Sequence, residues 1–123
     1  MTTVRSYRDL VVWKEAIGLA KSVYKLSADF PRREVYGLTS QIRRAAVSIP
    51  SNIAEGHARN STREYIRFVS IALGSLAELE TQICLAVELE FCTQPQVDEV
   101  LKIAEILGRR LHALQSSLNA KVE

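Results

Sequence analysis

Apolar residues recur at intervals of three and four along most of this chain, which is the period of an amphipathic α-helix. In the first run, over residues 9–29, the apolar positions are Leu10, Trp13, Ala16, Ile17, Ala20, Val23, Tyr24 and Leu26. Ser6 and Asp9 have the spacing of a capping box, in which each side chain accepts a hydrogen bond from the other residue's backbone. The pattern predicts a first helix over residues 9–29.

The second run predicts a helix from Arg32 to Gly56, with Leu38, Ile42, Ala45, Ala46, Ile49 and Ile53 on its apolar face. Pro31 favours the opening of a helix and glycine often follows the last turn of one. Pro50 lies inside this run and has no N–H for the carbonyl of Ala46, so we expect a kink in the second helix. The alternative is a break near residues 48–51, which would give five helices.

Two further runs complete the chain. Ser61 and Glu64 form a capping-box pair before a long helix that we expect to reach Phe91. Its apolar positions include Tyr65, Phe68, Val69, Ala72, Leu76, Leu79, Ile83, Ala86 and Val87. Thr93 and Gln96 form a similar pair before the last helix, whose apolar positions are Val97, Val100, Leu101, Ala104, Leu107, Leu111, Leu114 and Leu118.

Four long helices joined by short connections predict antiparallel neighbours. The expected fold is therefore all-α, an antiparallel up-down-up-down four-helix bundle with a proline kink in its second helix. With 123 residues, 47% of them hydrophobic, the chain has the size of one domain, and we expect a single domain over residues 1–123.

We expect a cytoplasmic protein without a membrane partner. The first residues contain no apolar segment of the kind found in signal peptides. No stretch approaches the roughly 18 uninterrupted apolar residues that a membrane span requires. Cys84 and Cys92, about 12 Å apart on one predicted helix, are too distant to form a disulfide with each other. We expect both to be reduced thiols in the core.

A polar stripe borders the apolar face of the second helix. It consists of Gln41, Arg44, Ser48, Asn52 and Glu55, which fall within an arc of about 80° at 100° per residue. Glu78 on the third helix could pair with Arg44. The favoured interpretation is that the stripe hydrogen-bonds to a neighbouring helix; a ligand site and a subunit interface are the alternatives.

The charge of the chain is unevenly distributed. Its net charge is only +2, but residues 1–60 hold ten Lys and Arg against five Asp and Glu, whereas residues 61–123 hold six against nine. Arg59, Arg63 and Arg67 recur at four-residue steps across the start of the third helix, where exposed N–H groups also attract phosphate. These three arginines are the candidate nucleic-acid contacts, and a merely solvated helix surface is the alternative.

The sequence contains no recognisable catalytic or metal-binding motif. His57 and His112 are far apart, and neither belongs to a Glu-x-x-His or His-x-x-x-His pattern. No glycine-rich phosphate loop, nucleophile elbow or Cys-x-x-Cys pair is found. We therefore expect no enzyme activity, no metal and no cofactor.

Three segments together resemble one family: "YRDLVVWKEA", "FPRREVYGLTSQIRRAAVSIPSNIAEGHAR" and "STREYIRFVSIALGSLAELETQI". They are similar to the four-helix-bundle proteins related to those encoded in bacterial 23S ribosomal RNA intervening sequences, and the similarity covers residues 7 to about 118. The resemblance implies an antiparallel bundle that assembles into a ring-like homopentamer. It also implies similarity to the accessory protein of diversity-generating retroelements, a basic pentameric barrel that binds nucleic acid and a reverse transcriptase.

Two functions are consistent with this resemblance. The first is a non-enzymatic, oligomeric bundle that acts as a nucleic-acid-binding accessory protein, with RNA or DNA as partner. The alternative is a structural or protein-interaction scaffold, with a protein partner and no nucleic acid. The family implies no catalytic residues, and the chain is less basic than the retroelement accessory proteins.

Overall fold

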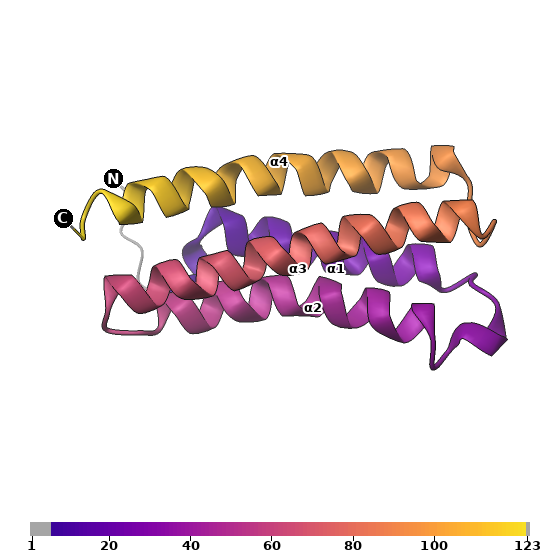
Figure 1. Cartoon of the computed structure of the whole chain (residues 1–123), viewed down its shortest axis with the longest axis horizontal. Coiled ribbons are helices and arrows are strands. Elements are labelled where there is room, and N and C mark those ends of the chain that lie inside the picture. The colour runs from indigo at the N-terminus through magenta and orange to yellow at the C-terminus, as the bar shows by residue number, and fades with distance from the viewer. Residues whose placement is uncertain (1–5, 123) are drawn as a thin grey trace.

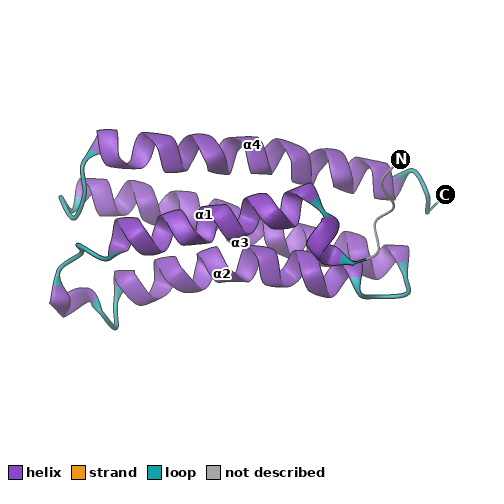
Figure 2. Ribbon diagram, turned by 180° about the vertical axis from the view of Figure 1, so that it is seen from behind, coloured by secondary structure: helices purple, strands orange, loops and turns teal. Residues whose placement is uncertain are grey.

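The computed structural model describes residues 6–122, and its regular elements in that range are all helices, without a strand. The helices are α1 (Val11–Ser27), α2 (Leu38–His57), α3 (Thr62–Glu88) and α4 (Gln94–Asn119), and two short 3-10 helices, η1 (Tyr7–Asp9) and η2 (Arg32–Glu34), precede α1 and α2. The four α-helices lie side by side along the long axis of the molecule (Figures 1 and 2). The predicted all-α fold is confirmed.

Each helix packs against two neighbours, and α2 packs most extensively against α3. The pairs α1 with α3 and α2 with α4 lie diagonally opposite each other, and within the described residues no Cα atoms of either pair come within 8 Å of each other. This is the arrangement of an antiparallel up-down-up-down four-helix bundle, as the short connections predict. The fully buried large side chains are Leu19, Val23, Ile42, Ile49, Ile53, Val69, Leu79, Ile83, Val97, Leu107 and Leu111.

The predicted capping box at the start of the first helix forms, but it caps η1 and not α1. The Ser6 hydroxyl accepts from the backbone N–H of Arg8, and the Asp9 carboxylate accepts from the N–H of Ser6. Leu10 is extended, with ψ 130°, so α1 begins only at Val11. The prediction of the cap is confirmed, but the sequence pattern did not predict the break at Leu10 between η1 and α1.

The start of the second helix differs from the prediction, because α2 begins at Leu38 and not at Arg32. Pro31 opens the 3-10 turn η2. The Glu34 carboxylate then accepts from the backbone N–H of Leu38 over 3.0 Å, which satisfies one of the free donors at the start of α2. The change leaves Val35 and Tyr36 in a turn outside the helix.

Pro50 does not break the second helix. α2 is continuous from Leu38 to His57, so the five-helix alternative is wrong. Pro50 is buried beside Ile49 and Ile53. The burial of Ile49 and Ile53 stabilises the helix at the point where the backbone hydrogen bond to the carbonyl of Ala46 is missing. The bend expected at Pro50 stays a prediction.

Gly56 lies inside the last turn of α2, and it is needed for a close helix contact more than for ending the helix. A Cβ atom at this position would lie 2.7 Å from Cβ of Phe68 and 3.0 Å from Cδ1 of Tyr65, both on α3. Only a residue without a side chain therefore fits where the ends of α2 and α3 meet.

The third helix ends at Glu88, three residues before the predicted end. Glu90 adopts the left-handed conformation, with φ 64°. Its N–H donates to the carbonyl of Val87, and the N–H of Phe91 donates to the carbonyl of Ala86, which is the Schellman pattern of helix ends. Glycine and asparagine are the residues that usually indicate such an end, and a glutamate stands here instead.

The early end of α3 also changes the position of the cysteines. Cys92 is buried in the connection that follows, where burial raises its pKa, and Cys84 is exposed on α3. Both thiols are free. The prediction of two core thiols on one helix is wrong in two respects: Cys84 is exposed and not in the core, and Cys92 lies beyond the end of α3. The predicted cap of the next helix is present, since Gln96 accepts from the N–H of Thr93 over 2.8 Å.

Among residues 6–122, α3 is the one helix that is long and apolar enough to cross a membrane, by length and composition alone. In the bundle its apolar side forms part of the core, with Phe68, Val69, Ala72, Leu76, Leu79, Ile83 and Ala86 buried. A helix that contributes a broad apolar face to the core of a bundle can therefore match a membrane span in length and composition.

Candidate functional site

The middle of the polar stripe joins α2 to α3. The hydroxyl oxygens of Ser48 on α2 and Ser75 on α3 lie 2.8 Å apart. The Asn52 amide donates to the carbonyl of Ser48 over 2.8 Å and to its hydroxyl over 2.9 Å. All three side chains are half-buried, so these hydrogen bonds satisfy polar groups at the edge of the core.

The rest of the stripe is exposed to solvent. Gln41, Arg44 and Glu78 line one small hollow, but no ion pair joins Arg44 to Glu78 among the described residues. Glu55 instead lies 3.9 Å from Arg59, and both side chains are at least half exposed. An exposed pair of this kind contributes little to stability. The stripe therefore divides into a hydrogen-bonded centre and solvated ends.

The predicted arginine row is only partly assembled. The guanidinium groups of Arg59 and Arg67 both lie over the ring of Phe68, at 5.0 and 5.8 Å from its centroid. Arg59 approaches Glu55, and Arg67 lies 4.0 Å from Glu64, so each shares its charge with a carboxylate. Arg63 borders a separate hollow with Ile66, next to the end of α4. That these three arginines contact phosphate stays a prediction.

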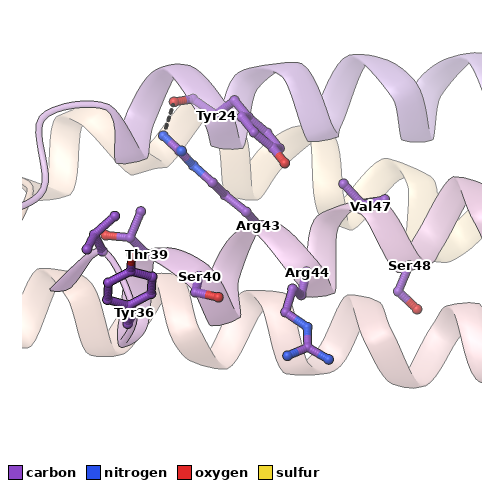
Figure 3. A pocket seen from close by; sticks show the side chains of 9 residues that line it. Tyr24, Tyr36, Thr39, Ser40, Arg43, Arg44, Val47 and Ser48 are labelled. Carbon is purple, nitrogen blue, oxygen red and sulfur yellow. Dashed lines mark hydrogen bonds between the residues drawn. The ribbon is translucent and has the colours of Figure 1, made fainter.

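A larger groove crosses the outer side of α2 next to α1, and we call it the α1–α2 groove (Figure 3). Its volume is about 560 Å³, and it is lined by Tyr24, Val35, Tyr36, Thr39, Ser40, Arg43, Arg44, Val47 and Ser48. None of the described residues that line it is a carboxylate. The groove therefore combines two cations with two aromatic rings and three small hydroxyl side chains.

Arg43 is held in place within this groove. Its Nε donates to the Ser27 hydroxyl over 2.8 Å, and one terminal nitrogen donates to the carbonyl of Tyr24 over 3.4 Å. The guanidinium lies 4.6 Å from the centroid of the Tyr24 ring, as expected for a cation–π contact. Figure 3 shows Arg43 reaching toward α1 while Arg44 points to the other side of α2.

Arg44 and Ser48 are the lining residues that the sequence identified as candidates, and Tyr36 is among those that it missed. Its side chain is 95% exposed. The sequence placed it inside a helix, although it lies two residues before Leu38 and hence off the apolar face defined by Leu38 and Ile42. That mismatch is the one sequence signal that could have identified it.

An apolar hollow of about 300 Å³ lies farther along the same two helices. It is lined by Tyr7, Trp13, Ile17, Ala20, Val47, Pro50, Ser51 and Ala54. Ile17 and Val47 are each 43% exposed, although both are large aliphatic residues. Val47 borders the α1–α2 groove as well, so the two depressions are neighbours on one face of the bundle.

One carboxyl group between α3 and α4 has a shifted pKa. Burial raises the pKa of Glu80, and the nearby negative charge of Glu105 raises it further. Glu105 is in turn hydrogen-bonded to Arg109. Shifted acids can mark active sites, but ion-pair networks between helices produce the same effect. Among residues 6–122, no group of three or more His, Cys, Asp or Glu side chains is placed to hold a metal ion.

Comparison with known proteins identifies the same family as the sequence resemblance. The family model of the 23S rRNA-intervening sequence protein matches residues 8–113. A search of curated proteins finds no match to this chain.

A solved structure has the same fold. It is the crystal structure of a protein of unknown function from the S23 ribosomal protein family of Bacteroides thetaiotaomicron. The two proteins are 23% identical, the match covers 85% of this chain and 98% of the other, and the TM-score is 0.77. At 23% identity the similarity establishes only the arrangement of the helices. The role of the groove has to be argued from the residues that line it.

Proposed function

The chain belongs to the family of 23S rRNA-intervening sequence proteins, and we propose that it is a non-enzymatic, oligomeric helical bundle that binds nucleic acid. The observation that carries the proposal is the α1–α2 groove, where Arg43 and Arg44 stand beside Tyr24 and Tyr36 and no described carboxylate joins the lining. Nucleic acid offers the two features that such a surface can bind, phosphate charge and aromatic base faces.

The distribution of charge supports a polyanionic partner. The first 60 residues carry the excess of arginine and lysine, and they include all of α1 and α2. The excess of acidic residues lies in the second half of the chain. A net charge of only +2 therefore hides a basic side, which is the side that holds the groove.

Assembly would multiply this modest basic surface. The apolar hollow exposes Ile17 and Val47, and a second copy of the chain is its proposed occupant, because the sequence resembles proteins that form homopentamers. Several grooves on one ring convert a weak contact per subunit into useful avidity. The resemblance to the accessory protein of diversity-generating retroelements points to the same combination of ring and nucleic acid.

The proposal of a non-enzymatic protein rests on the polar groups that the bundle brings together. Among residues 6–122, Glu80 is the one carboxyl group with a raised pKa, and the hollow that it borders also holds Glu105, Arg109 and His112. Of these, Glu105 and Arg109 bind each other. No serine, threonine or cysteine is among the described residues that line this hollow, so a nucleophile with an adjacent base is missing there. Glu80 is better explained as a partly buried acid between two helices.

The direct test is a fluorescence-anisotropy titration of the purified protein with labelled single-stranded RNA, single-stranded DNA and duplex DNA at low salt. We expect weak but measurable binding to at least one of them. If none binds, the proposal is wrong. The remaining function is then a protein-interaction scaffold, which the exposed apolar hollow also favours.

A further inference from the structure

We propose that the α1–α2 groove binds a single-stranded nucleic acid, with one unpaired base stacked on Tyr36 and a backbone phosphate at Arg44. The inference rests on the proposed nucleic-acid function. It goes further in naming the form of nucleic acid and the residues that distinguish a single strand from a duplex.

The first argument is the exposure of Tyr36. A tyrosine that packs against its own protein gains stability from its ring, and Tyr36 gains almost none, since its side chain is 95% exposed. No hydrogen bond or ring contact within residues 6–122 occupies this side chain. The fold therefore gives no reason for an aromatic residue here, whereas a stacking platform for a ligand does.

The second argument is that the backbone below Tyr36 is fixed. The N–H of Gly37 donates to the carbonyl of Glu34 over 2.9 Å, and the N–H of Val35 donates to the carbonyl of Arg32 over 3.1 Å. The Glu34 carboxylate binds the first turn of α2 through Leu38. These bonds anchor the turn on both sides of the exposed ring. A ring presented by an ordered turn loses less conformational entropy when a base stacks on it.

The third argument is the state of the two arginines. Arg43 is bound only to neutral groups, the Ser27 hydroxyl and the Tyr24 carbonyl, so its charge is not neutralised. Arg44 is exposed and has no ion pair among the described residues, and it also borders the small hollow that Glu78 lines. Arg59, Arg67 and Arg109 all approach carboxylates. Arg43 and Arg44 therefore give the groove two guanidinium groups that no ion pair among the described residues neutralises.

The arrangement favours a single strand over a duplex. In a duplex both faces of each base are covered by stacking, so an aromatic ring on a protein surface cannot reach them. An unpaired strand can place a base on Tyr36 and continue along α2, past Ser40 to Arg44 (Figure 3). The small hydroxyl groups of Thr39 and Ser40 leave space for a base of any kind. We therefore expect little sequence preference.

The test measures the affinity of Tyr36 variants for a labelled oligothymidylate and for a duplex of matched length at low salt. Tyr36→Ser should weaken oligothymidylate binding by about tenfold, because the stacking of one base is removed. Tyr36→Phe should bind like the wild type, since the ring is kept. Duplex binding should be the same for all three proteins. Leu89→Ser, which removes an exposed apolar side chain just after α3, is the matched control and should leave both affinities unchanged.

Three results would overturn the inference. The first is oligothymidylate binding by Tyr36→Ser that equals that of the wild type, which would leave nucleic-acid binding intact and remove Tyr36 from it. The second is a change in oligomeric mass by light scattering in Tyr36→Ser, because the groove would then be a subunit interface. The third is a wild-type protein that binds no nucleic acid at all, which would remove the proposed function along with this site.

Discussion

At the scale of single residues, Gly56 gives the sharpest expectation about stability. In Gly56→Ala the new methyl group would meet Phe68 at 2.7 Å and Tyr65 at 3.0 Å, so α2 and α3 must move apart. Overpacking of this kind costs about 1–3 kcal/mol. The free energy of unfolding, measured by urea denaturation, should fall by that amount.

Gly74→Ala is the control for this prediction. It places the same methyl group on an exposed helical position where nothing lies within 4 Å. Alanine is a better helix former than glycine by about 0.5–1 kcal/mol, so this variant should be more stable than the wild type. Two variants shifted in the same direction would show that the contact at Gly56 has been misassigned.

The polar stripe provides a second pair of substitutions at the residue scale. Asn52→Ala removes two hydrogen bonds to Ser48 and should lower the free energy of unfolding by about 1 kcal/mol. Glu55→Ala removes only an exposed pair with Arg59 and should change it by less than about 0.5 kcal/mol. Thermal denaturation of both variants measures the difference. Equal melting temperatures would mean that Asn52 is solvated.

Residue-scale features were predictable where one local pattern determines them. The side chains of Ser6 and Gln96 cap backbone groups as their spacing indicates. Ser61 accepts from the N–H of Glu64 in the same way. The partner of Ser48 could not be predicted, because Ser75 lies on another helix and meets it only after α2 and α3 have packed. Whether Arg44 meets Glu78 also depends on how α2 and α3 pack, and no ion pair joins them among the described residues.

At the scale of elements, the end of α3 contains local strain. Glu90 occupies the left-handed region with φ 64°, where a Cβ atom is unfavourable and glycine is not. Glu90→Gly should therefore raise the free energy of unfolding by about 0.5–1 kcal/mol. Glu88→Gly, within the last turn of α3, should lower it by a similar amount. Urea denaturation of both variants is the measurement, and a destabilised Glu90→Gly would contradict the assignment of a Schellman end.

The seam between α3 and α4 gives an expectation about pH. In the folded state the pKa of Glu80 is raised, mainly by burial and further by the negative charge of Glu105. At pH values between the ordinary pKa of 4.5 and the raised pKa, the folded protein therefore binds more protons than the unfolded one. Stability from this group is thus present at acid pH and lost as the pH rises. In Glu80→Gln the side chain does not titrate, so the loss of stability with rising pH that comes from this group is removed.

The measurement is urea denaturation of Glu80→Gln and the wild type at about pH 4 and about pH 7. The variant should gain stability relative to the wild type as the pH rises between these values. A stability difference that is constant, or that grows toward acid, would show that Glu80 titrates normally.

Element boundaries were the least predictable part of the fold. The second helix was expected from Arg32, but the Glu34 carboxylate caps α2 at Leu38 and excludes the residues before it. A glutamate that acts from three residues before the N-cap position, Gly37, does not match the Ser, Thr, Asp or Asn that usually occupies the N-cap itself. The helices themselves, their order and their packing follow from the long apolar faces.

At the scale of the whole molecule, the apolar hollow predicts self-assembly. Ile17→Glu places a charge where a second copy is proposed to pack, so the variant should have the monomer mass of 13.8 kDa by light scattering. The wild type should be larger, with a pentamer as the proposed state. Leu89→Glu, exposed just after α3, is the control and should keep the wild-type mass. A monomeric wild type at micromolar concentration would contradict assembly.

The α1–α2 groove is also a property of the whole molecule. Arg43 was visible in the sequence as part of a basic half, but its contacts with Tyr24 and Ser27 join residues that lie 16 or more positions apart. Tyr36 is exposed in the turn before α2, and the late start of that helix is not revealed by the apolar pattern. The sequence could therefore indicate a basic half, and only the packed bundle brings its arginines and tyrosines into one groove.

The salt dependence of binding tests nucleic-acid recognition most directly. The affinity of the wild type and of Arg44→Gln for a labelled oligothymidylate would be measured by fluorescence anisotropy over a series of salt concentrations. The logarithm of the binding constant should fall linearly with the logarithm of the salt concentration, and the slope should be shallower for Arg44→Gln by about 0.7 for each phosphate that the arginine neutralises in the wild type. An affinity that does not change with salt, or no binding at the lowest concentration, would contradict nucleic-acid binding by this bundle.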